Sequence, residues 1–240
     1  MAACEDPRVD QAFSIDQALD AFIGDQRQRL SARTLANYEE IVDLLRDSLN
    51  GYGPNSLDGL DQRRWQKAYD AGDEEAFCHL LGPEHILEHL GEFLGYFMVH
   101  KVIAGQELLR SAGTVAKKLA GWLHEHGYAS ADAAQVAAER GARAARDLPR
   151  AERLASLLYE QSRATADFDP AQLAEADLVE DYLVIDRVER GKLYFADGTG
   201  PVPISAQAAE LAEPGWAVSI TLARLGRIWK IVEVGNVYSS

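Results

Sequence analysis

The residue spacing closest to a catalytic motif is a His-x-x-Glu-His run at residues 85–89. Two histidines four residues apart on a helix can reach one zinc ion, and the intervening glutamate could activate a zinc-bound water. Apolar residues between and after them predict a core-facing stripe, which leaves the polar positions on the solvated side: His85, Glu88, His89 and Glu92. A third carboxylate ligand cannot be identified, so we expect no metal and no cofactor.

Other catalytic patterns are weaker still. Cys4 lies in a polar N-terminal stretch, and Cys78 lies among apolar residues, where a small core residue is expected. His124 and His126 follow a predicted helix, whose C-terminal dipole favours such residues as caps. The sequence has no glycine-rich phosphate loop leading into a helix and no Ser-His-Asp or Cys-His arrangement. We therefore expect a protein that is not an enzyme.

Charge is unevenly distributed along the chain. The 240 residues include 24 Lys and Arg against 38 Asp and Glu, which gives a net charge of −14. Such acidity disfavours non-specific coating of nucleic acid or anionic membranes. Residues 101–150 nevertheless carry a net charge of +3, so a local field could still attract an anionic partner.

Helical periodicity and capping residues predict an all-α region up to about residue 175. Ser14 and Gln17 form a capping box, Ser31 begins a second helix, and Gly82-Pro83 begins a longer one. Ser111 or Thr114 is expected to cap the next helix. Ser130 is expected to begin an alanine-rich helix, Pro149 another, and residues 165–177 a short helical connector.

From residue 178 the pattern changes to strands. Two hairpin signals, at 189–192 and 224–227, flank a Pro-Val-Pro-Ile edge strand and a short helix that starts at Ser205. This order predicts a small five-stranded β-barrel. Trp216, Trp229 and Tyr194 could form an aromatic platform for single-stranded nucleic acid, but alternation favours the core for them. The predicted fold class is α+β: a helical bundle followed by the barrel.

Two segments of the helical region resemble the core-binding domain of tyrosine recombinases and phage integrases. Residues 30–38 (LSARTLANY) are similar to an "LS..T...Y" helix start, and residues 111–128 are similar to a later "S..T....L..L..WL...G" helix. The resemblance covers about residues 13–128 and implies a SAM-like helical module that clamps duplex DNA. It gives four segments: a tail at 1–12, the recombinase-like domain at 13–128, a helical connector at 129–177 and the barrel at 178–240.

The resemblance does not extend to catalysis. A recombinase has a catalytic domain of well over a hundred residues with an Arg-His-Arg set and a tyrosine nucleophile, whereas 112 residues follow Tyr128 here. Tyr238 lies near the C-terminus, as that nucleophile does, but no Arg-His-x-x-Arg precedes it. We interpret Tyr238 as structural and expect no strand exchange.

The resemblance and the basic block together indicate one candidate DNA surface. Basic residues around the later helix would contact phosphates, and hydroxyls at its start would add hydrogen bonds. The start of the second helix is the other place where the family has its DNA face. The candidate residues are Arg33, Thr34, Lys101, Arg110, Ser111, Thr114, Lys117 and Lys118.

Two functions from different classes follow. The first is a non-catalytic DNA-binding accessory protein that uses the helical module on the duplex backbone. The alternative is a protein-interaction or scaffold module without a nucleic-acid role, which the net charge favours. The chain has no run of about 18 apolar residues and no signal-peptide pattern, so we expect a cytoplasmic protein that does not enter a membrane.

Overall fold

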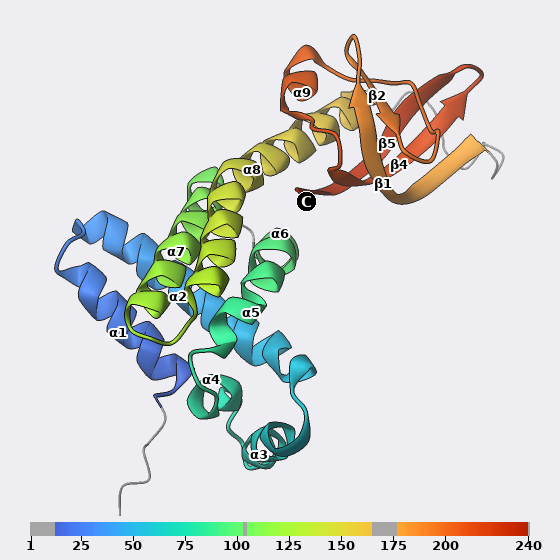
Figure 1. The fold of residues 1–240 in the computed structure, drawn as a ribbon. Coiled ribbons are helices and arrows are strands. Elements are labelled where there is room, and N and C mark those ends of the chain that lie inside the picture. The colour runs from blue at the N-terminus through green and yellow to red at the C-terminus, as the bar shows by residue number, and fades with distance from the viewer. Residues whose placement is uncertain (1–12, 103–104, 165–176, 240) are drawn as a thin grey trace, which may run out of the picture. The chain divides into compact units, whose positions relative to one another are not determined.

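The computed structural model describes residues 13–102, 105–164 and 177–239, which form two compact units (Figure 1). Unit 1 extends to Phe93 and includes Val115–Ala138, and unit 2 consists of Leu94–Thr114 and the chain from Glu139 onward. The α+β class is confirmed, because a helical N-terminal part precedes a five-stranded antiparallel sheet. Within the described ranges, no helix combines the length and apolar character needed to cross a membrane.

Unit 1 is helical, and its first two helices begin where the capping residues predict. The Ser14 hydroxyl accepts from the Gln17 amide while the Gln17 side chain accepts from the Ser14 amide, and Ser31 caps the second helix. The elements wholly within this unit are α1 Ile15–Arg27, α2 Ala32–Tyr52, the 3-10 helix η1 Gly53–Ser56, α3 Gly59–Asp70, α4 Ala76–Leu80 and α5 His85–Glu92.

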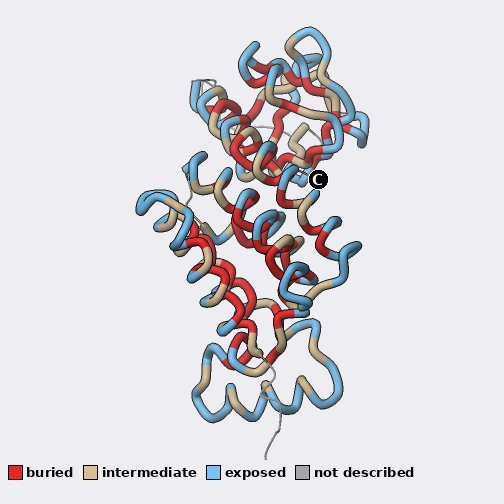
Figure 2. Tube along the Cα trace, turned by 60° about the vertical axis from the view of Figure 1, so that its left-hand side comes forward, coloured by how far each residue is buried: buried red, intermediate tan, exposed pale blue. Residues whose placement is uncertain are grey.

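The core of unit 1 is aromatic as well as aliphatic. Phe22 is fully buried and contacts Tyr38 and Trp122, with ring centroids 6.2 and 5.9 Å apart. Gly53 lies against the Phe77 ring, where an added Cβ would come within 2.5 Å of the ring. By contrast, α3 has no buried residue, and its trace has only exposed and intermediate colours in Figure 2.

The helices that enter both units differ from the predicted boundaries. After α5 the chain continues through a π-helical turn, η2 Phe93–Phe97, into α6 Met98–His100. Helix α7 spans Gln106–Glu125, so the prediction that Ser111 or Thr114 caps it is wrong. Both hydroxyls instead donate to the carbonyl four residues earlier, Ser111 to Glu107 and Thr114 to Arg110.

The prediction of two helices between residues 130 and 164 is also wrong. A single 34-residue helix, α8 Ala131–Ala164, contains Pro149 in its interior. Proline removes one backbone donor and its ring crowds the carbonyl four residues earlier, and packing along the helix offsets this cost. The predicted connector at 165–177 lies outside the described residues except for Asp177.

Unit 2 contains an open sheet rather than the predicted barrel. Its elements are β1 Leu178–Val188, β2 Lys192–Phe195, β3 Val202–Pro203, α9 Ala206–Leu211, β4 Ala217–Leu225 and β5 Ile228–Tyr238. The strand order is β3-β2-β1-β4-β5, and β3 and β5 are not hydrogen-bonded to each other. Closure fails because β3 has two residues, one of them a proline without an N–H donor.

Helix α8 covers the inner face of this sheet. Leu154, Leu157 and Leu158 belong to one buried cluster with side chains from all five strands and α9. Gln161 fastens the two layers, since its amide nitrogen donates to the Pro203 carbonyl at 2.7 Å and its oxygen accepts from the Ser205 amide at 3.1 Å. The helix therefore supplies the apolar cover that barrel closure would otherwise provide.

Candidate nucleic-acid interface

A solvent-accessible groove in unit 1 is lined by residues at and just after the end of α1, by α2, by the second half of α7 and by Ala138 of α8. Its volume is about 490 Å³. Three exposed cations, Arg29, Lys117 and Lys118, line it together with one carboxylate, Glu125. We call this site the cationic groove, and its other lining residues are Gln26, Leu30, Tyr38, Gly121, Trp122 and Ala138.

One lining residue of the groove, Trp122, is held in place by a hydrogen bond and by ring stacking. Trp122 is 5% exposed, and its indole N–H donates to Asp25 Oδ2 at 2.8 Å. The His126 ring stacks on the indole with centroids 4.0 Å apart, and its Nε2 lies 3.9 Å from the same carboxylate. The Asp25 carboxylate therefore accepts a hydrogen bond from Trp122 and lies next to His126.

Two of the predicted residues lie in the groove. Lys117 and Lys118 are exposed on α7, where the buried positions Leu119 and Leu123 direct the other side of the helix into the core. Arg33 and Thr34 lie in the first turn of α2, three and four residues after Leu30, but do not line the groove. The Thr34 hydroxyl is 3.0 Å from the Ser31 hydroxyl and belongs to the cap of α2.

The other four predicted residues belong to unit 2. Lys101 follows α6 and is exposed, and Arg110 is exposed on the first half of α7. Ser111 and Thr114 lie within α7, and their hydroxyl protons are used in the backbone hydrogen bonds described above. They are therefore not at a helix N-terminus, where free backbone N–H groups would bind a phosphate.

Sequence reasoning missed Arg29 and the Asp25–Trp122 pair. Arg29 follows α1 by two residues, and nothing in its local pattern distinguishes it from Arg27, which forms an ion pair with Glu39 at 3.0 Å. Asp25 and Trp122 are 97 residues apart in the chain. Only the tertiary packing of α1 against α7 brings these groups together.

The His-x-x-Glu-His motif does not form a metal site. Contrary to the solvated position predicted for it, His89 is buried, and its ring meets Phe77 edge-on. Its Nε2 lies 3.2 Å from the Ser56 hydroxyl, and burial lowers its pKa. Across the described residues, no group of three or more His, Cys, Asp or Glu could hold a metal ion. Ser56 is thus the hydrogen-bond partner of the buried His89 ring.

The two isolated nucleophile candidates are structural. Cys78 is buried, as predicted, and burial raises its pKa to about 12, so the reactive thiolate is disfavoured. Tyr238 donates its hydroxyl to His100 Nε2 at 2.6 Å, since His100 Nδ1–H is committed to the Tyr96 carbonyl. Burial raises the Tyr238 pKa, which is the wrong direction for a nucleophile.

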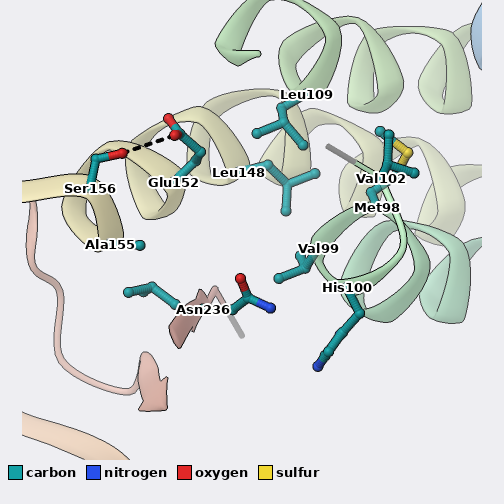
Figure 3. Close-up of a pocket in the computed structure, with 11 residues that line it drawn as sticks. Met98, Val99, His100, Val102, Leu109, Leu148, Glu152, Ala155, Ser156 and Asn236 are labelled. Atoms are coloured by element: carbon teal, nitrogen blue, oxygen red, sulfur yellow. Dashed lines mark hydrogen bonds between the residues drawn. The ribbon is translucent and has the colours of Figure 1, made fainter. Parts of the chain in front are cut away.

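Unit 2 has a cavity of about 330 Å³ between α6, α8 and the end of β5, shown in Figure 3. Its described lining residues are both apolar and polar, and they include one carboxylate, Glu152. Glu152 accepts a hydrogen bond from Ser156 at 3.0 Å, and the lining His100 has both ring nitrogens engaged. The cavity can admit a small molecule, and among its described lining residues Glu152 and His100 both have hydrogen-bond partners within the protein.

The sheet of unit 2 does not offer the aromatic platform considered above. Trp216 is buried beneath Arg150, as its expected core position requires, while Trp229 and Tyr194 are half-buried. A shallow hollow on the outer face is instead lined by Glu180, Asp181 and Glu233. This acidic lining would repel a phosphate backbone.

Comparisons of the chain with protein-family models, with curated protein sequences and with solved structures gave no match.

Proposed function

We propose that the chain is a non-catalytic DNA-binding accessory protein that holds the backbone of duplex DNA in the cationic groove of unit 1. One observation carries the proposal. Both segments that resemble a recombinase core-binding domain line this same groove, Leu30 and Tyr38 from the first and Lys117, Lys118 and Trp122 from the second.

The geometry suits phosphate rather than base recognition. Lysine and arginine side chains around a wide groove can neutralise phosphates along a strand without reading sequence. The buried, hydrogen-bonded Trp122 supports the floor and has no exposed edge to insert between bases. Binding is therefore expected to be salt-dependent and nearly independent of sequence.

The test is the double variant Lys117→Ala/Lys118→Ala, measured by fluorescence anisotropy on a labelled duplex of about 30 bp at about 50–200 mM salt. We expect weakening of about tenfold across unrelated sequences and a salt slope lowered by about two. The matched control is Lys192→Ala/Arg227→Ala, which removes two exposed cations from unit 2. Equal affinity of the two double variants would reject the groove.

A protein partner is the second candidate function, and exposed apolar residues of unit 2 favour it. Tyr182 and Val184 lie two residues apart on β1, so they share one face of the sheet, and they are 60% and 43% exposed. Tyr182→Ser/Val184→Thr should abolish capture of a protein partner while leaving duplex binding unchanged. Loss of duplex binding in this variant would reject the division of roles between the units.

A further inference from the structure

Helix α3 of unit 1 presents a basic face that the cationic groove does not include. Its residues Leu60, Arg63, Arg64 and Lys67 have the spacing i, i+3, i+4 and i+7, which places them along one side of the helix. All four are exposed, and Leu60 is 70% exposed. We call them the α3 basic face.

The half-buried side of α3 accounts for this orientation. The half-buried positions are Asp61, Trp65 and Ala68, which also follow helical spacing, and α4 is the helix that α3 packs against. Trp65 stacks on Tyr69 with ring centroids 5.2 Å apart, which stiffens this side. The helix is therefore held from one side, and the basic face is left toward solvent.

Two carboxylates on the helix itself are already engaged. Asp61 pairs with Arg64 at 3.6 Å, and Asp70 accepts from Gln66 at 2.8 Å. After the helix, Asp73 lies 3.0 Å from His79 Nδ1. In this part of the described chain, no contact to a carboxylate accompanies the exposed Arg63 and Lys67, so both cations are available to an outside anion.

We propose that the α3 basic face is a second phosphate-contacting surface, which binds the nucleic-acid backbone outside the groove. The inference rests on the proposed function, since it assigns the same partner to a further element. Charge complementarity selects the partner: Arg63 and Lys67, beside the Arg64 that is paired with Asp61, make this face positive in a chain whose net charge is −14. A lipid surface fits less well, because Leu60 is the sole large apolar side chain on this face.

A helix without buried residues permits a clean test. Arg63→Ala/Lys67→Ala removes two cations and no packing, and alanine is a strong helix former, so the variant should fold like the wild type. Gln62→Ala is the matched neutral control on the same helix, and Lys192→Ala/Arg227→Ala is the charge-matched control in unit 2. Far-UV circular dichroism and the thermal midpoint confirm folding.

Anisotropy on the labelled duplex of about 30 bp should show binding about threefold to tenfold weaker for Arg63→Ala/Lys67→Ala at about 100 mM salt, with the salt slope lowered by about two. Both controls should bind like the wild type.

The four variants separate the two proposals. Weakening by Lys117→Ala/Lys118→Ala alone, with Arg63→Ala/Lys67→Ala equal to its controls, overturns the α3 face and leaves the groove intact. Weakening by Arg63→Ala/Lys67→Ala alone rejects the groove and supports the α3 face. A wild-type chain that does not bind the duplex even at about 50 mM salt overturns both.

Discussion

The cationic groove of unit 1 and the hollow on the outer face of the unit 2 sheet carry opposite charge. Three cations and one carboxylate line the groove, whereas Glu180, Asp181 and Glu233 line the hollow without a lysine or arginine. The net charge of −14 is thus an average over surfaces of different sign. Under the proposed function, a polyanion would be attracted to the first surface and repelled by the second.

The largest effect should come from reversing the charge of the groove. Lys117→Glu/Lys118→Glu gives the groove the sign of the hollow, so it replaces attraction by repulsion and should weaken duplex binding by about 100-fold or more at low salt. Fluorescence anisotropy at about 50 mM salt measures the loss. A loss of affinity below about threefold would contradict the proposal that the charge of the groove, rather than that of the hollow, determines duplex binding.

A second effect concerns how the groove is supported. Asp25→Ala leaves the Trp122 indole N–H without its acceptor in a nearly buried site and should lower the free energy of unfolding by about 1–3 kcal/mol. Urea unfolding followed by far-UV circular dichroism measures it. Asp25→Asn keeps an acceptor oxygen and should lose less; equal losses would show that the hydrogen bond is not what stabilises the groove.

A third effect is the pH dependence of the free energy of unfolding that arises from His89 in unit 1. Burial lowers the pKa of His89, so between its ordinary value of about 6.5 and the lower folded value the unfolded chain binds more protons. The stability contributed by neutral His89 is therefore present above pH 6.5 and is lost as the pH falls. Asp73 raises the pKa of His79, which acts in the opposite direction but at a more exposed site.

Urea unfolding at several values between about pH 5 and 8 should show this loss for the wild type and a flatter dependence for His89→Gln. A wild-type stability that rises on acidification through this range would contradict the assignment to His89.

The smallest effect should come from neutralising the hollow. Glu180→Gln/Glu233→Gln removes two exposed carboxylates from a surface that, in this account, does not touch the duplex. Screening over about 10 Å at 0.1 M salt limits their influence, so binding should strengthen by less than about threefold. A much larger gain in the anisotropy titration would place the sheet of unit 2 against the DNA.

Local features of this fold could be predicted from the sequence. The capping box at Ser14 and Gln17, the cap at Ser31 and the two hairpins depend on residues three or four apart, and the structure confirms them. Cys78 was expected in the core because of its apolar neighbours and Trp216 because of strand alternation, and both are buried. Each of these features depends on residues close together in the chain, so a short segment is enough to predict it.

Features that depend on distant partners could not be predicted. Pro149 fits a helix start locally, but packing of α8 on the sheet keeps it inside one long helix. The same packing replaces barrel closure, which five strands alone would suggest. Arg29 joins Lys117 and Lys118 in the groove, and His89 meets Ser56, only after the helices of unit 1 have assembled.

Binding of duplex DNA by this chain is tested by titrating the full chain into a labelled random duplex of about 30 bp at several salt concentrations and following fluorescence anisotropy. We expect an affinity that falls steeply and linearly on logarithmic axes as salt rises, as several neutralised phosphates require. Absence of binding at about 50 mM salt, where backbone contacts are strongest, would contradict it.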